Sequence, residues 1–148
     1  MSAAPPDFDA FNRSLMIAIP VFNRMGHCQR LLESLHASRD LLPANVHAFD
    51  DASHEFAPEQ LRGLLHPEAQ LLRFSQHSGS ADQALTRIFQ RFVHSPTHQH
   101  LALLDCGLIV ADGWLRAAWL GTVRAHGVLS LLNTPMHRTE HLIECTPT

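Results

Sequence analysis

The run LMIAIP at residues 15–20 decides the fold, because a nearly continuous apolar stretch of this length suits a strand buried on both faces. A turn at residues 22–24 follows it. The next apolar side chains then recur at the spacing of one helix face, at Cys28, Leu31, Leu32 and Leu35. A buried strand that leads directly into an amphipathic helix indicates an α/β protein with parallel strands.

The same order of strand and helix recurs along the chain. Further strands are predicted at residues 46–50, 71–74 and 101–104, with a last candidate at 128–132. Helices are predicted after Pro58, at residues 81–92, where Ser80 and Gln83 have the form of a capping box, and after Asp112, which is placed to cap the helix. The alternation predicts a three-layer α/β/α sandwich around a mostly parallel sheet.

The chain has 148 residues and a mass of 16.5 kDa, which suits one domain with a real core. Residues 1–14 are polar and contain two adjacent prolines, so we expect a flexible leader there. Residues 15–133 then form the domain, and residues 134–148, which have no period, form an irregular tail.

The charge and the residue usage exclude several classes of protein. The net charge is -3 and the pI is about 6.4, so nothing favours a nucleic-acid partner. All 11 basic residues are arginine, which excludes lysine chemistry. The cysteines at positions 28, 106 and 145 form no C-x-x-C pair and no disulfide framework.

The sequence also predicts a reduced, cytoplasmic protein without a membrane span. The longest apolar run, residues 15–22, is far too short to cross a bilayer. The segment before it carries Asp7 and Asp9 instead of the positive cluster of a signal peptide.

Polar residues follow each of the first four predicted strands. In parallel sheets, ligands bind outside the carboxyl ends of the strands. The segments that qualify are residues 20–23, 50–53, 75–79 and 105–107, so we expect these segments to converge on one crevice.

Four segments resemble, in order and spacing, motifs of the family-2 glycosyltransferases with the GT-A fold. IAIPVFNR at residues 17–24 is similar to the family's opening strand and its Pro-Val-Tyr-Asn-Arg turn, and FDDAS at residues 49–53 to its Asp-Asp-Gly-Ser motif. RFSQHSG at residues 73–79 resembles the segment that leads to a glycine beside the nucleotide. LLDCGLIVADGWL at residues 103–115 resembles the Asp-x-Asp strand and the Pro-x-Trp-Leu helix after it. The resemblance runs from about residue 15 to residue 133.

The resemblance implies an inverting glycosyltransferase, and the chain looks like the half that binds a UDP-sugar. The implied nucleotide-sugar site consists of Pro20, Val21, Phe22, Asn23, Asp50, Asp51, Arg73, Gly79 and Asp105. In this reading Asp50 accepts the imide N–H of the base, and Asp105 meets the ribose or a metal-linked region. The same residues also have structural explanations, since the aspartates suit strand ends and turns, Arg73 suits a surface, and Asn23 suits a helix cap.

Two departures from the family pattern bear on metal use. Asp-x-Asp sites hold a divalent cation, Mg²⁺ or Mn²⁺, on the diphosphate of the donor. Gly107 stands where the second acid belongs, so only Asp105 carries over as a metal ligand. The Ala-Arg-Asn segment of the family is replaced by QALT at residues 83–86.

The catalytic base is not evident in the sequence. The resemblance places the base and the acceptor site after the Asp-x-Asp strand. The acids after Gly107 are Asp112, Glu140 and Glu144, and none forms a Glu-Asp motif. The base is therefore missing or belongs to another chain, so a homo-oligomer or a partner that completes the site is expected. The alternative is a non-catalytic nucleotide-sugar-binding or protein-interaction module descended from such an enzyme.

Two further features suggest chemistry that the pattern does not favour. The histidines at positions 94, 98 and 100 lie in a predicted polar loop without the spacing of a zinc site. Cys106 lies beside Asp105, but no base for a nucleophilic thiol is visible, so we expect a packing residue.

Overall fold

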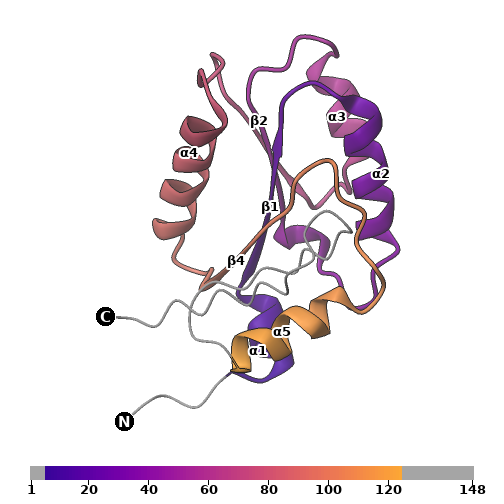
Figure 1. The fold of residues 1–148 in the computed structure, drawn as a ribbon, viewed down its shortest axis with the longest axis vertical. Coiled ribbons are helices and arrows are strands. Elements are labelled where there is room, and N and C mark those ends of the chain that lie inside the picture. The colour runs from indigo at the N-terminus through magenta and orange to yellow at the C-terminus, as the bar shows by residue number, and fades with distance from the viewer. Residues whose placement is uncertain (1–5, 125–148) are drawn as a thin grey trace, which may run out of the picture.

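The computed structural model of the chain describes residues 6–124, which form an α/β fold (Figure 1). Its sheet has four parallel strands in the order β3-β2-β1-β4. The strands are β1 (Leu15–Val21), β2 (Val46–Asp50), β3 (Gln70–Arg73) and β4 (His100–Leu103). The helices within these residues are α1 (Phe8–Arg13), α2 (Met25–His36), α3 (Pro58–Leu64), α4 (Ala81–Val93) and α5 (Trp114–Arg124), with a 3₁₀ turn at Pro43–Asn45.

Strand β1 is buried on both faces, as the apolar run predicts. Ile17 and Ile19 face the larger core cluster, which also contains the buried side chains of α2. Met16 and Ala18 face a smaller cluster that includes Ile88 of α4. The alternation of side chains along a strand explains why a continuous apolar sequence was needed here.

The helices form layers on the two faces of the sheet, which confirms the three-layer prediction. Helices α2 and α3 lie on one face and α4 lies on the other (Figure 1). From β1 the chain builds outward through β2 and β3, and after α4 it returns to the other side of β1 as β4. This reversal between β1 and β4 is the position where α/β sheets bind ligands.

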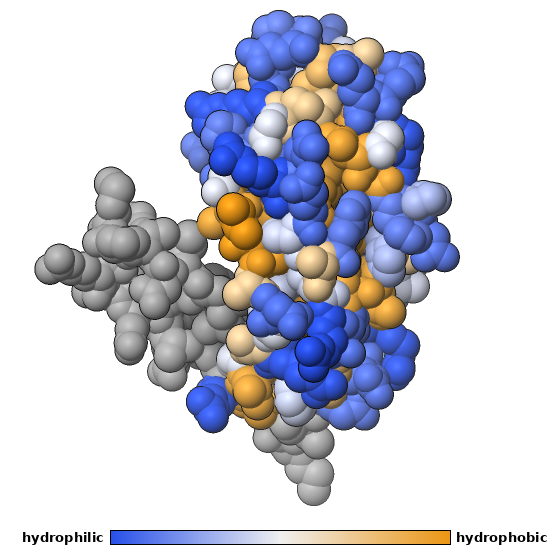
Figure 2. All heavy atoms as spheres, turned by 90° about the vertical axis from the view of Figure 1, so that its right-hand side faces the viewer, coloured by the Kyte–Doolittle hydropathy of each residue, from blue (hydrophilic) through white to orange (hydrophobic). Residues whose placement is uncertain are grey.

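The outer surface of the α2 and α3 side is mostly hydrophilic, with smaller apolar areas between the polar side chains (Figure 2). Within residues 6–124, no helix combines the length and the apolar character needed to cross a membrane.

The prediction of a flexible leader is wrong for residues 8–13, which form α1. Phe8 and Phe11 are buried in the larger core cluster, and Asp7 accepts a hydrogen bond from Ala10 N at 2.7 Å as the N-cap. The Trp119 indole N–H of α5 donates to the Pro6 carbonyl at 2.9 Å, so the two helices are tied together. Two phenylalanines one helical turn apart supply enough apolar surface to hold this short helix against the core.

Most other predicted elements are found, with one change of role. Ser80 caps α4 by accepting from Gln83 N at 3.2 Å. Asp112 does not cap α5, because its carboxylate accepts from Arg39 N at 3.0 Å and pairs with the Arg39 side chain. The candidate strand at 128–132 and the tail at 134–148 lie outside the described residues.

Candidate functional site

The carboxyl ends of β1, β2 and β3 are aligned by the sheet register. Val21 pairs with Asp50, and Asp50 pairs with Arg73. Two further backbone hydrogen bonds continue the alignment, from Asp51 N to the Val21 carbonyl and from Phe74 N to the Asp50 carbonyl, both at 2.8 Å. The loops that follow the three strands therefore start side by side, as the sequence predicts.

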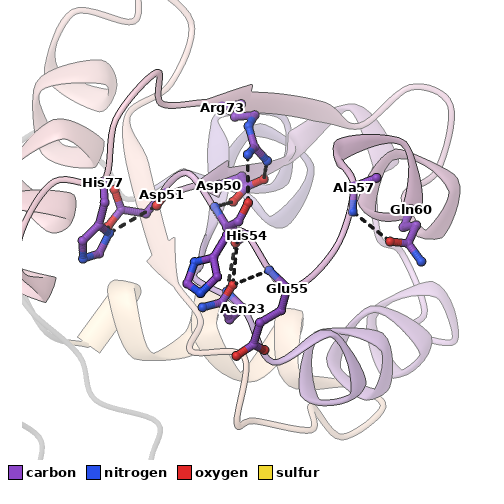
Figure 3. Close-up of polar contacts among 10 residues, drawn as sticks. Asn23, Asp50, Asp51, His54, Glu55, Ala57, Gln60, Arg73 and His77 are labelled. Atoms are coloured by element: carbon purple, nitrogen blue, oxygen red, sulfur yellow. Dashed lines mark hydrogen bonds and ion pairs between the residues drawn. The ribbon is translucent and has the colours of Figure 1, made fainter.

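Asp50 is fully buried, and both of its carboxylate oxygens have partners (Figure 3). One oxygen accepts from Ser53 N at 2.9 Å, and the other accepts from the Arg73 guanidinium at 2.6 Å. A second Arg73 nitrogen donates to the Ser53 carbonyl at 2.8 Å. Asp50 and Arg73 thus hold the loop after β2 against β3, and the Asp50 carboxylate is not accessible to solvent.

Asn23 organises the contact between the loops after β1 and β2 (Figure 3). Its side-chain oxygen accepts from His54 N at 3.0 Å and from Glu55 N at 3.1 Å, while its own backbone N–H donates to Ser53 Oγ at 2.9 Å. Asn23 therefore does not cap α2, whose N-cap residue is Arg24 and lacks a side-chain hydrogen bond.

Non-glycine residues with positive φ are concentrated at these loops. Asn23 and Arg24 both have φ of 56°, and Ala52 has φ of 57°. Such conformations cost free energy and persist where the surrounding contacts hold them, as at binding sites. Here the hydrogen bonds of Asn23 and Ser53 supply those contacts.

Asp51 joins the loop after β2 to the loop after β3. Its carboxylate accepts from Ser78 N at 2.8 Å and from Ser78 Oγ at 2.7 Å. Nδ1 of His77 lies 2.9 Å from a carboxylate oxygen of Asp51 and 3.2 Å from its carbonyl oxygen. Both of these oxygens can only accept, so His77 Nδ1 carries a proton.

Phe22 stands at the edge of the sheet with 43% of its surface exposed. Its ring stacks on the His77 ring with a centroid distance of 4.2 Å and an interplanar angle of 23°. The ring of His54 meets Phe22 edge-on at 5.9 Å. The result is an aromatic surface directly above the buried Asp51 cluster.

Asp105 follows β4 and is exposed to solvent. It accepts a hydrogen bond from Gly107 N at 3.2 Å. The next residue, Cys106, is buried and donates its thiol to the Pro20 carbonyl at 3.3 Å, which ties this loop to the end of β1. A hydrogen bond with Cys28 and burial raise the pKa of Cys106, so it stays a protonated thiol, in agreement with the predicted packing role.

The remaining predicted residues shape the backbone. Pro20 and Val21 end β1, and Val21 is buried. Gly79 has φ of 99°, which side chains rarely adopt, and it leads into the N-terminus of α4. A small cavity of about 250 Å³ lies beside the loop after β4, between that loop and α2.

Within residues 6–124, the loop after β4 does not supply the ligand set of a divalent-cation site. Asp105 is the one carboxylate that the family pattern leaves at this position, and Gly107 has no side chain to offer. Among residues 6–124, no group of three or more histidine, cysteine, aspartate or glutamate side chains is placed to hold a metal ion.

The predicted site residues do not include four residues that the structure places there, namely Ser53, His54, His77 and Ser78. His77 and Ser78 lie within the segment 73–79 that resembles the family, where the resemblance implies only Arg73 and Gly79 as site residues. The contact between Ser78 and Asp51 spans 27 positions, so no local spacing could have revealed it.

Comparison with known proteins shows the fold. No protein-family model and no curated protein matches the chain. Among solved structures, that of S. aureus TarS 1–349 gives a TM-score of 0.54 with 18% identity over 76% of this chain. The structure of S. aureus TarS 1–349 in complex with UDP gives a TM-score of 0.56 at the same identity and coverage. The chain spans 33% of the length of these TarS chains, so the likeness extends to one part of a larger protein.

Proposed function

We propose that this chain binds a UDP-sugar at the carboxyl edge of its sheet and serves as the donor-binding domain of an inverting glycosyltransferase. One observation carries the proposal. The loops after β1, β2 and β3 meet beside the reversal between β1 and β4, and they present the Phe22–His77 stack above the Asp51–Ser78 cluster. The fold it shares with TarS, which has been crystallised with UDP, supports the nucleotide as the ligand.

The exposed aromatic surface is the proposed contact for the base. Every nucleobase has a flat π-face that can stack on an aromatic ring. Each such stack contributes about 1–3 kcal/mol to the binding free energy. Phe22 has 43% of its surface exposed and the His77 side chain also has 43% exposed, so a base can contact the exposed part of this stack.

In this proposal the buried polar residues hold the loops of the site in place and do not contact the ligand. Asp50 has both oxygens engaged and holds Arg73 and Ser53 in place. Asp51 fixes the loop that carries His77. Direct polar contacts with the ligand fall to groups at the surface, including Asp105 on the ribose or diphosphate side of the site.

The chemistry expected of this domain is a single displacement at the anomeric carbon. A base removes the proton of an acceptor hydroxyl, the oxygen attacks from the face opposite the nucleotide, and UDP leaves. The described residues supply the donor site in this scheme. The base and the acceptor site are assigned to a further part of the protein or to a partner chain.

Titration of UDP into the full chain by isothermal calorimetry tests the proposal. We expect saturable binding that weakens at least about fivefold in Phe22→Ala, from the loss of one stacking contact. Phe89→Ala is the matched control, because Phe89 is 45% exposed on α4 and away from the site. Absence of UDP binding, or equal losses in both variants, would overturn the proposal.

A non-catalytic nucleotide-sugar-binding module is the second candidate, and the glycine at position 107 favours it. This candidate predicts the same binding but no turnover. Incubation with UDP-sugars and a panel of acceptors, followed by measurement of released UDP, separates the two. UDP release above the spontaneous rate supports the enzyme, and its absence with intact binding supports the module.

A further inference from the structure

A second cavity lies at the opposite end of the sheet from the candidate site. Its volume is about 390 Å³, within the range of sites for small ligands. Its lining residues come from the end of α4, from the segment between α4 and β4, and from the amino ends of β1 and β2. Figure 1 shows where these segments lie in the fold. Its polar lining consists of His47, Arg91, His94, Ser95 and His98.

Each of the three imidazoles is held through its Nδ1 atom. His47 Nδ1 lies 2.9 Å from the Asn45 carbonyl, and His94 Nδ1 lies 2.7 Å from the Gln90 carbonyl. His98 Nδ1 lies 2.7 Å from Ser95 Oγ. A carbonyl only accepts, so in His47 and His94 the Nδ1 atom carries a proton and Nε2 remains for a ligand.

The lining contains one arginine, three histidines and no carboxylate. His47 shares this lining with Arg91 of α4, with the C-cap residue His94, and with His98 from the segment before β4. Burial lowers the pKa of His47, and the charges of His98 and Arg91 lower it further, against the hydrogen bond to Asn45. Burial also lowers the pKa of His98. Arg91 therefore carries a permanent charge, and burial together with the repulsion from Arg91 and His98 disfavours protonation of His47 unless an anion offsets them.

We propose that this cavity is a binding site for an oxyanion of the phosphate class, held by Arg91, Ser95 and the protonated imidazoles. A bound anion offsets the repulsion between the positive charges of the lining and accepts hydrogen bonds that water would otherwise accept. Binding of the anion therefore favours protonation of His47 and His98. Binding therefore takes up protons and strengthens as the pH falls. The inference is independent of the proposed function at the carboxyl edge.

A transition metal is the competing ligand for neutral imidazoles, and the rings of His47 and His98 are 5.3 Å apart. Arg91 opposes a cation at this position, however, because its charge already acts on His47. No metal-binding group of three such side chains occurs in the part of the chain that the structure describes. The anion is therefore the occupant that the lining favours.

The test uses sulfate as the probe, because its charge does not change between pH 6 and pH 8. Sulfate is titrated into the full chain by calorimetry at both values, and at each pH in two buffers that differ in ionisation enthalpy. We expect binding at least about tenfold tighter at pH 6, with proton uptake visible as a buffer-dependent heat. No saturable binding at pH 6, or binding without proton uptake, would overturn the proposal.

Variants on one helix locate the site. Arg91→Gln is expected to weaken sulfate binding at least about tenfold. Arg87→Gln, one turn earlier on α4, is the matched control, because the Arg87 side chain lies over the Phe74 ring at 4.5 Å and does not line the cavity. His98→Gln, at a half-buried position, should reduce the proton uptake and the pH dependence together. Equal effects of Arg91→Gln and Arg87→Gln would overturn the assignment.

Two further titrations identify the ligand class. Tighter binding of glycerol 3-phosphate than of inorganic phosphate indicates a site for a phosphate ester, and the reverse order indicates one for the free ion. Either result supports the proposal if Arg91→Gln weakens the binding of both ligands. Binding of Zn²⁺ with proton release, in a protein that binds no anion, would assign the cavity to a metal instead.

Discussion

Asp50 and Asp51 are adjacent in the chain, yet their carboxylates hold different parts of the molecule. Asp50 points into the protein and pairs with Arg73 on the neighbouring strand, whereas Asp51 reaches the loop before α4 (Figure 3). Successive side chains leave a strand on opposite faces, and the pair sits where β2 ends, so the division follows from strand geometry. One acidic dipeptide thereby fixes both loops that border the candidate site.

The Asp50–Arg73 pair gives a stability prediction. Arg73→Met should lower the free energy of unfolding by about 3 kcal/mol, because it leaves a fully buried carboxylate without its charged partner. The double variant Asp50→Leu/Arg73→Met should be more stable than Arg73→Met by at least about 1 kcal/mol, since it removes the unpaired charge. Urea unfolding followed by circular dichroism measures both values.

An exposed ion pair serves as the control for this prediction. Arg39 and Asp112 lie 3.7 Å apart with 78% and 58% of their side chains exposed. Because solvent screens such pairs, Arg39→Met should change the stability by less than about 1 kcal/mol. The single variant Asp50→Leu completes the comparison. If its loss of stability and that of Arg73→Met simply add in the double variant, Asp50 and Arg73 are not coupled.

At the scale of the elements, α1 shows how a short helix becomes part of a core. Phe11 is 1% exposed and its ring lies 4.9 Å from that of His100 at the start of β4. Phe8 meets Trp119 of α5 edge-on at 5.8 Å. The helix thus closes the amino end of the sheet and joins the first and last described helices.

This packing predicts a large effect of one phenylalanine and a small effect of another. Phe11→Ala should destabilise the protein by about 3–5 kcal/mol, because it empties a fully buried site. Phe89→Ala should cost less than about 1 kcal/mol, since its ring is 45% exposed. Thermal and urea unfolding of the two variants give the comparison, and similar losses in both would show that α1 is not packed on the core.

The sequence predicts the elements that have a strong apolar period, and it fails where the decisive contact is distant. Ile17 and Ile19 in a continuous apolar run, and Ile88 on a helix face, identify their elements without other information. Helix α1 has only two large apolar side chains, Phe8 and Phe11, so the sequence alone predicts a flexible leader. The contact of Phe8 with Trp119 of α5 appears only in the folded chain. Likewise Asp112 lies where a helix cap is expected, but its carboxylate accepts a hydrogen bond from Arg39 N, 73 positions away in the chain.

The candidate site follows the same division. The resemblance of four segments predicts which strand ends carry polar residues, and the parallel sheet brings three of them into register. The sequence does not distinguish a carboxylate that contacts a ligand from one that holds a loop. That distinction depends on burial, and only the folded chain shows that Asp50 is buried and Asp105 exposed.

For the molecule as a whole, the sheet separates two regions of different chemistry. The carboxyl edge presents aromatic rings and acidic residues, while the amino edge presents a cavity with arginine and histidines. Helix α4 runs between them, with its capped N-terminus beside Gly79 and its C-terminus at the cavity. A variant in one region should therefore leave binding in the other intact, which makes each proposal a control for the other.

The position of Gly107 allows the role of the missing acid to be tested by restoring it. A Cβ atom at Gly107 would meet nothing within 4 Å, so an aspartate fits there without displacing a neighbour. In the natural chain we expect Mn²⁺ and EDTA to give UDP affinities within about twofold of each other, because a single carboxylate holds a divalent cation poorly.

In Gly107→Asp, a second oxygen ligand stands two residues from Asp105, and a cation shared with the diphosphate offsets its charge. UDP should then bind at least about fivefold tighter in Mn²⁺ than in EDTA. Gly107→Asn adds nearly the same volume without the charge and should show a smaller metal effect. Equal affinities with and without Mn²⁺ in Gly107→Asp would mean that the loop after β4 does not reach the diphosphate, and the nucleotide would have to lie elsewhere on the edge.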